Sequence, residues 1–342
     1  MVNANKPQVL AEMTMFSLLD LCPVTEGNNV ADALRNSLDL ARHAEDWGYH
    51  RYWVAEHHNM PGIASAATAV VIGHIAAGTS TIKVGAGGIM LPNHSPLVIA
   101  EQFGTLEALF PGRIELGLGR APGTDQATAY ALRRNLNADI DQFPQDVVEI
   151  LGYFSPSSTG QKVCAVPGQG ANIPVWILGS STFGAQLAAA LGLPYAFASH
   201  FAPDDLLAAV QIYRKNFRPS AYLDKPYVMT GFTVMAAETD DEAQYLASSM
   251  QQGFLNLRLG RPGKFPPPKE NFINEIPRDH KAILDHVLAC SAIGSAATVA
   301  KKIAAFMAQV QPDELIITGN MYHHETRLRS FQIAAEVIQS LN

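Results

Sequence analysis

The sequence predicts an α/β fold of the (β/α)8 TIM-barrel class with insertions. Short runs of apolar and β-branched residues alternate about eight times with segments of helical periodicity. This alternation is typical of repeated βα units around a parallel sheet. The chain has 342 residues, 48% of them hydrophobic, which suits one large barrel domain. We therefore expect a single domain over residues 1–342.

Eight strands are expected, each from a short run rich in apolar and β-branched residues. The third is unusual because it runs from Thr81 into the glycine cluster Gly85–Gly88. Its glycines indicate a backbone that another group approaches closely. The predicted strands are 14–19, 49–55, the one that starts at Thr81, 113–118, 175–178, 195–198, 227–236 and 314–318.

Helices are expected between the strands, with recognisable start and stop residues. Asn29 is the expected N-cap of the first helix and Gly48 its stop, Pro96 suits a first helical turn, and Gly192 closes a later helix. A hairpin-like insert is expected at 163–173. The predicted helices are 30–47, 64–77, one from Ser95, 125–154, 183–191 and 325–341.

Composition excludes several classes of protein. The net charge is −7, which argues against a general nucleic-acid surface, since phosphate binding needs clustered Lys and Arg. The longest apolar stretch is too short and too interrupted to span a membrane, and the first twelve residues lack the pattern of a secretory leader. Three widely spaced cysteines indicate neither a disulfide framework nor a cysteine metal site. We expect a cytoplasmic protein with small-molecule partners.

Residues 258–280 form a proline-rich insertion that is too long for an ordinary connection. The run Pro266-Pro267-Pro268 excludes a helix or a central strand there. We interpret the segment as a mobile lid. A surface excursion without function is the alternative.

Candidate catalytic residues are sought just after each strand, because barrel enzymes carry their active sites at the C-terminal ends of the strands. The second strand ends in Glu56-His57-His58. Adjacent residues point to opposite sides, so at most one histidine faces the mouth. His57 suits general acid or base catalysis, and a histidine that only hydrogen-bonds the loop is the alternative. No metal site is expected, although a metal site remains open as an alternative through the other histidines that follow strands: His94, His200, His323 and His324.

Two further segments point to an anion. Gly117-Leu118-Gly119 lacks the third glycine of a dinucleotide fingerprint because position 122 is Pro. Arg120 follows, and its guanidinium could bind an anion or pair with Asp125. Gly179, Ser180, Ser181 and Thr182 precede a helix, whose first N–H groups suit a phosphate; a plain N-cap is the alternative for the serines. A glycine strand, a phosphate site and a nearby histidine together suggest FMN.

The chain resembles the bacterial luciferase-like flavin monooxygenase family, most closely its YhbW-like subgroup, over nearly its whole length. The resemblance is carried by Phe16–Leu21, Arg51–Met60, Val84–Pro96, Pro111–Asp125 and Pro174–Pro203.

The resemblance implies roles for individual residues. His57 matches the catalytic histidine. Ala86-Gly87 matches a non-proline cis peptide beneath the flavin ring, with Gly88 beside it. Arg120, Ser180 and Ser181 match the phosphate contacts, whereas Gly179 stands where the luciferase subunit has an acidic residue. Gly179 and Thr182 are expected to bind the cofactor beside them. The expected members of a substrate pocket are Phe16, His58, Met60, Met90, Asn93 and Phe201.

The resemblance also implies a reaction. A flavin reductase would supply reduced FMN, O2 would add to form a C4a-hydroperoxyflavin, and the protein, expected to be a homodimer, would oxygenate a small organic substrate. Three alternatives stay open: an F420-dependent hydride-transfer oxidoreductase of the same fold, a non-catalytic flavin-binding protein, and a metal-dependent barrel hydrolase.

Overall fold

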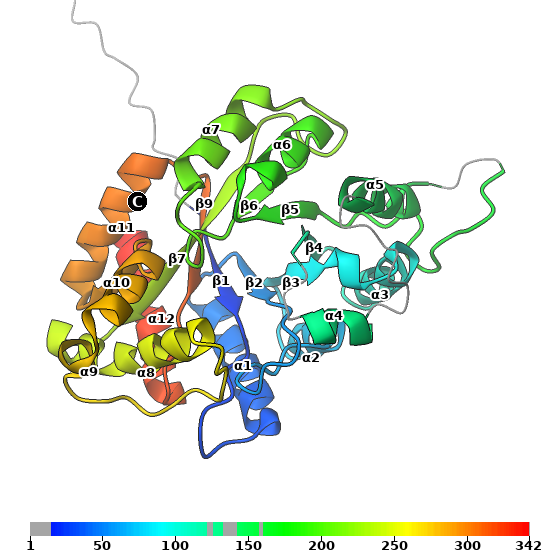
Figure 1. The fold of residues 1–342 in the computed structure, drawn as a ribbon. Helices are drawn as coiled ribbons and strands as arrows, with labels where there is room; N and C mark the ends of the chain where they lie inside the picture. The colour runs from blue at the N-terminus through cyan, green and yellow to red at the C-terminus, as the bar shows by residue number, and fades with distance from the viewer. Residues whose placement is uncertain (1–14, 122–125, 133–141, 157–159, 342) are drawn as a thin grey trace, which may run out of the picture.

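The computed structural model describes residues 15–121, 126–132, 142–156 and 160–341 (Figure 1). Eight parallel strands form a closed barrel in the order β1-β2-β3-β4-β5-β6-β7-β9, and β9 pairs back onto β1. Their bounds are β1 Met15–Asp20, β2 Arg51–Val54, β3 Lys83–Met90, β4 Ile114–Gly119, β5 Val175–Gly179, β6 Tyr195–Phe197, β7 Val228–Ala236 and β9 Glu314–Thr318.

The (β/α)8 prediction is confirmed, and each of the eight predicted strands corresponds to a barrel strand. Thr14, the first residue of the predicted first strand, lies outside the described residues. A ninth strand, β8 (Ser291–Gly294), was not predicted. It lies outside the ring and pairs only with the last residues of β7. A strand of only four residues, most of them small, is too short to show the alternating pattern of apolar residues from which strands are predicted.

Helices surround the barrel on its outer side (Figure 1). Among the described residues, no helix combines the length and the hydropathy needed to cross a bilayer. The helices are α1 Val30–Asp46, α2 Thr68–Ala77, the 3-10 turn η1 Leu91–Asn93, α3 Pro96–Leu109, α4 Gln126–Leu132, α5 Phe143–Phe154, α6 Thr182–Leu191, α7 Leu206–Asn216, α8 Asp240–Arg258, α9 Phe272–Glu275, α10 Arg278–Val287, α11 Ala296–Val310 and α12 His324–Leu341.

Helix ends follow the local chemistry of the sequence. Asn29 and Asp32 form a reciprocal capping box at the start of α1. Gly48 and Gly192 follow α1 and α6 with φ of +82° and +64°, a backbone region that glycine adopts without a steric penalty. Pro96 opens α3 as expected.

Two local predictions were wrong. The predicted 125–154 helix corresponds in its described parts to two helices, α4 and α5, with residues 133–141 and Asp125 outside the described residues. Residues 163–173 contain turns and no strand, so they are not a hairpin. Pro167, Gly168 and Gly170 favour turns there, and Gly168 packs so tightly that an added Cβ would lie 2.6 Å from the Ala100 carbonyl oxygen.

The insertion at 258–280 contains the end of α8, the short helix α9 and the start of α10. Its backbone is bonded to the loop after β1, with Phe265 N–H donating to the Val24 carbonyl at 2.9 Å and Glu26 N–H donating to the Phe265 carbonyl at 2.8 Å. A Cβ on Gly62, in the loop after β2, would lie 2.4 Å from the Gly263 carbonyl oxygen. The segment therefore lies against two mouth loops, and its mobility stays a prediction.

A buried ion pair joins the first strand to the last helix. Arg327 of α12 contacts the carboxylate of Asp20 at the end of β1, and both side chains are at most 2% exposed. The Tyr52 hydroxyl and the Cys22 N–H also donate to this carboxylate. Burial acts to raise the pKa of Asp20, but the Arg327 charge and the hydrogen bonds prevail and lower the pKa. Asp20 is therefore ionised and fully compensated.

We expect Arg327→Ala to lower the free energy of unfolding by about 3–5 kcal/mol, because it leaves the Asp20 carboxylate buried without its cation. Urea unfolding measures the effect. Arg329→Ala, on the exposed part of the same helix where Arg329 pairs with Glu238, is the control and should cost at most about 1 kcal/mol. Equal losses in the two variants would contradict a special role for the buried pair.

Candidate functional site

The candidate site lies at the C-terminal mouth of the barrel, where the segments after β2 to β6 meet. Since these strands are neighbours in one parallel ring, the residues that follow them share one face. The structure places Glu56, His57 and His58 after β2, His94 after η1, Arg120 after β4, the start of α6 after β5, and His200 after β6.

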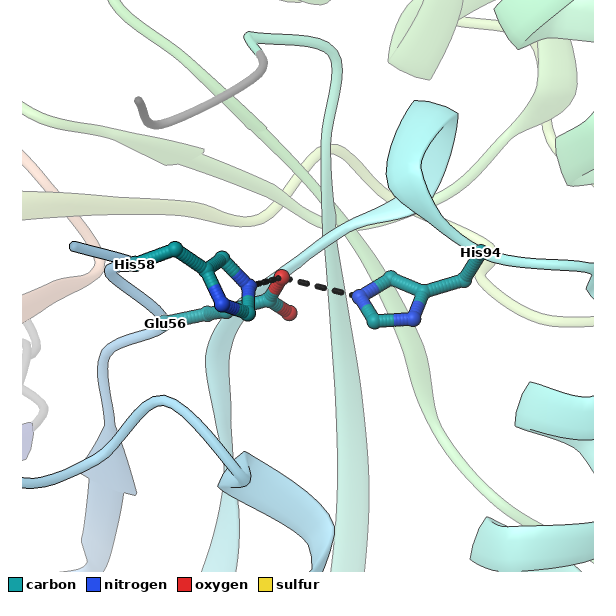
Figure 2. Close-up of side chains that lie close together, drawn as sticks. All are labelled: Glu56, His58 and His94. Carbon is teal, nitrogen blue, oxygen red and sulfur yellow. Dashed lines mark hydrogen bonds and ion pairs between the residues drawn. The ribbon is translucent and has the colours of Figure 1, made fainter. Parts of the chain in front are cut away.

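The Glu56 carboxylate lies between two histidines, His58 and His94, and contacts both (Figure 2). Its Oε1 lies 2.7 Å from Nε2 of His58 and 2.8 Å from Nε2 of His94. Its Oε2 accepts a hydrogen bond from the Met90 N–H at 3.1 Å. Burial acts to raise the pKa of Glu56, but His94, His58 and the Met90 amide outweigh burial and lower it. The ionised carboxylate thus connects the ends of β2 and β3.

His57 is half-buried at the mouth, on the segment that Glu56 and His58 fix from either side. His57 interacts electrostatically with His200 across the mouth. Burial, and to a smaller extent the charge of His57, lowers the pKa of His200 to about 4. His200 packs directly on β7, since a Cβ on Gly231 would lie 2.0 Å from its Nδ1. Gly231 is therefore required to admit the His200 ring, which stays neutral at neutral pH.

The cis peptide of β3 lies one residue later than predicted. It joins Gly87 to Gly88, not Ala86 to Gly87. Ala86 still pairs regularly with Leu116 of β4, and the register shifts only between Ala86 and Ile89. The irregular part of the strand therefore begins after Ala86, whose methyl group is buried in the core.

The glycines of β3 also have a packing role. A Cβ on Gly88 would lie 2.6 Å from the Gly117 carbonyl oxygen of β4, and one on Gly87 would lie 2.8 Å from Leu19 and 3.0 Å from Trp53. Contacts this short with backbone or a buried indole exclude any side chain. The close approach predicted from these glycines is thus made by the protein itself, and a flat ligand is not needed to explain them.

Arg120 is placed at the start of α6. Its guanidinium carbon lies 4.1 Å from the ring centroid of Phe183, in the first turn of that helix. Ser181 is the N-cap of α6 but makes no capping hydrogen bond with its side chain, so the first N–H groups are not satisfied by a cap. A cation and a helix N-terminus converge there. Asp125, the predicted alternative partner of Arg120, lies outside the described residues.

The predicted pocket residues are not all brought together. Phe16 lies at the opposite, N-terminal end of the barrel, packed edge-on against Tyr49 with ring centroids 4.8 Å apart. That end of a strand points away from the mouth, so Phe16 does not belong to this site. His58 belongs to the Glu56 cluster, and Asn93 is buried in η1. Met60 lies in the loop after β2, and Phe201 is 41% exposed beside the guanidinium of Arg258.

Sequence reasoning missed the parts played by Glu56, His94 and His200. Glu56 was visible as a carboxylate directly after an apolar strand, which is a costly position unless it is paired. His94 and His200 were visible only as histidines after strands. Their partners lie 38 and 31 residues away in the chain, so only the folded barrel reveals the contacts.

The lowered pKa of His200 predicts a pH dependence of stability. Because the folded pKa of about 4 is below the ordinary value of about 6.5, this histidine contributes stability above pH 6.5 that is lost as pH falls towards 4. We expect His200→Gln to lose less of its free energy of unfolding than the wild type between pH 6.5 and 4. Urea unfolding across this range tests it. The exposed His74→Gln is the control, and identical curves for His200→Gln and the wild type would contradict the prediction.

The chain matches known proteins over most of its length. A model of the family described as luciferase-like monooxygenase matches residues 14–313. A protein of Escherichia coli strain K12 described as a luciferase-like monooxygenase is 52% identical over 326 residues, which cover 95% of this chain and 97% of that protein. YvbT, an uncharacterized protein of Bacillus subtilis strain 168, is 53% identical over 325 residues, 95% of this chain and 96% of YvbT. N-acetyl-S-alkylcysteine monooxygenase of the same strain is 39% identical over 255 residues, 73% of this chain and 75% of that enzyme.

Solved structures share the architecture. Apo-MsnO8 superposes with a TM-score of 0.85 at 32% identity and covers 95% of this chain and 98% of its own. Two more distant structures share the fold alone. They are the oxygenating constituent of 3,6-diketocamphane monooxygenase from Pseudomonas putida in complex with FMN (TM-score 0.69, 16% identity, 96% and 98% covered) and an F420-dependent secondary alcohol dehydrogenase with an F420-acetone adduct (TM-score 0.69, 14% identity, 97% and 100% covered).

Proposed function

The chain belongs to the luciferase-like monooxygenase family, and from that premise we propose that it uses reduced FMN and O2 to oxygenate a small organic substrate. The position of Arg120 over Phe183, at the start of α6, is the observation that best supports a flavin with a phosphate group. The FMN complex of a fold neighbour is consistent with it.

The phosphate end of the proposed site is built from a charge and a helix terminus. Stacking on Phe183 holds the Arg120 guanidinium in one orientation, which reduces the entropy lost when an anion binds. The uncapped start of α6 adds N–H donors and the positive end of the helix dipole. Gly179, Ser180, Ser181 and Thr182 supply this terminus and would contact the phosphate, with Gly87 and Gly88 of β3 beside the ring.

A reduced flavin, when bound, supplies the electrons that activate O2. The part of the protein is to orient the reactants, exclude water and handle protons. His57 is the proposed proton donor and acceptor, since it is half-buried at the mouth and the bonds of Glu56 fix the backbone around it. Residues 258–280, bonded to the loop after β1, would cover the mouth as a lid.

We further propose a cytoplasmic homodimer that receives reduced FMN from a separate flavin reductase. The substrate is a small molecule reached through the mouth, with Met60, Asn93 and Phe201 near its entrance. The name of the relative that acts on N-acetyl-S-alkylcysteine makes thioethers the first substrates to assay. Substrates that would be oxygenated at a carbonyl, nitrogen or carbon centre are the next to assay.

An F420-dependent hydride transfer is the second candidate, since the barrel is shared with an F420-dependent dehydrogenase. The two differ in their need for O2. A substrate-derived product that carries an oxygen atom from O2, formed with reduced FMN, supports oxygenation, whereas anaerobic oxidation of reduced F420 by a substrate supports hydride transfer. A protein that binds flavin without either reaction would belong to the non-catalytic class.

Arg120→Ala should weaken FMN binding by about 10- to 100-fold, the range of a lost charge-assisted hydrogen bond. The same substitution should leave riboflavin binding nearly unchanged, because riboflavin has the same ring and no phosphate. Fluorescence titration of wild type and variant with both flavins measures this. Arg42→Ala, which removes an exposed arginine that donates to the Gly78 carbonyl, is the matched control. Equal affinity of the wild type for FMN and riboflavin would overturn the phosphate assignment.

His57→Ala should bind FMN almost as the wild type does, yet lose substrate oxygenation by about 10²- to 10⁴-fold, the usual contribution of a positioned acid or base. The measurement is product formed per reduced FMN consumed, with hydrogen peroxide release recorded in parallel. His74→Ala, an exposed histidine of α2, controls for removal of a ring. Unchanged turnover would remove His57 from the mechanism.

A further inference from the structure

Three potential metal-ligand atoms converge at the mouth of the barrel beside His57. A carboxylate oxygen of Glu56 and one ring nitrogen each of His58 and His94 lie within 4.8 Å of one another. Figure 2 shows the two imidazole rings approaching the same carboxylate oxygen from different segments of the chain. Within the described part of the chain, it is the one cluster of three or more His, Cys, Asp or Glu side chains whose ligand atoms lie close enough together to hold a metal ion.

We propose that Glu56, His58 and His94 form a binding site for a divalent transition-metal ion, which nothing in the proposed flavin chemistry requires. Two imidazoles and a carboxylate are a donor set that Zn²⁺ takes in proteins, and imidazole also suits Fe²⁺, Ni²⁺ and Cu²⁺. Hard cations such as Mg²⁺ are disfavoured because two of the three donors are nitrogens.

Burial and support of the ligands favour a built site over a chance cluster of surface groups. The Glu56 side chain is 1% exposed, while those of His58 and His94 are 13% and 26% exposed. The second oxygen of Glu56 is held by the Met90 amide, the kind of outer bond that orients metal-binding carboxylates. The carboxylate is thus held by a backbone amide, and the partly exposed imidazoles leave access for water, which can complete the coordination.

Metal binding would replace the present hydrogen bonds. Both Nε2 atoms now lie at hydrogen-bond distance from Oε1, 2.7 and 2.8 Å. Around a tetrahedral ion with ligands at about 2.0–2.1 Å, neighbouring donor atoms are about 3.3 Å apart. Each contact therefore opens by roughly half an ångström, which side-chain rotation can supply while the Met90 bond stays in place. The ion would also immobilise the segment that carries His57, between two of its ligands.

The test is Zn²⁺ binding to the flavin-free, tag-free protein by isothermal titration calorimetry, with the metal content measured after dialysis. We expect close to one equivalent per chain, a rise in the thermal midpoint with Zn²⁺, and at least a 10-fold loss of affinity in His94→Ala and in His58→Ala. Glu56→Gln should lose binding as well. Because Glu56 is buried, the partly exposed His94 provides the decisive variant if Glu56→Gln does not fold.

Asp39→Asn is the matched control. Asp39 of α1 contacts His324 at 2.8 Å and His43 at 3.8 Å, so the substitution removes a carboxylate that also lies beside two histidines and leaves Glu56, His58 and His94 unchanged. It should leave Zn²⁺ affinity unchanged. Absence of saturable binding in the wild type, or full affinity in His94→Ala and His58→Ala, would overturn the proposal. The measurement uses no flavin, so its outcome is independent of the proposed reaction.

Discussion

The ion pair between Asp20 and Arg327 connects the parts of the barrel on which the site depends. Arg327 reaches the end of β1 through Asp20 and the end of β9 through the Gly319 carbonyl. The same carboxylate holds Tyr52 of β2 and the backbone of the loop after β1. A charge pair this deeply buried is tolerated only when its other polar atoms are satisfied. The loops that carry Glu56 and His57 therefore start from a rigid rim.

The barrel could be predicted because each of its strands is a buried run with its own stop signals. The caps Asn29 and Gly192 were predictable for the same reason, since they act on their immediate neighbours. The ninth strand was not predictable, because short elements are set by tertiary contacts more than by periodicity. The predicted position of the cis peptide was wrong by one residue. The irregular part of β3 depends on its register against β4, and that register is a property of the pair of strands.

The site was predictable in its position and only partly in its members. Residues after parallel strands meet at one face, so His57, Arg120 and the start of α6 could be placed at the mouth. The roles of Glu56 and His200 depend on residues from other parts of the chain, His94 for Glu56 and Gly231 for His200. Phe16 shows the converse error: a residue at the start of a strand lies at the far end of the barrel from the mouth. Whether a residue lies at the start or at the end of its strand therefore decides whether it can belong to the site at the mouth.

The pairing of β1 with β9 has a consequence for biosynthesis. The two strands stand at opposite ends of the chain, Met15–Asp20 and Glu314–Thr318. At ordinary rates of translation, roughly 15–60 s separate their emergence from the ribosome. During that time one edge of β1 has no partner strand, and an open edge can pair with another chain. The edge of β1 that β9 finally pairs is therefore a site open to intermolecular pairing until the last strand is made and the ring closes.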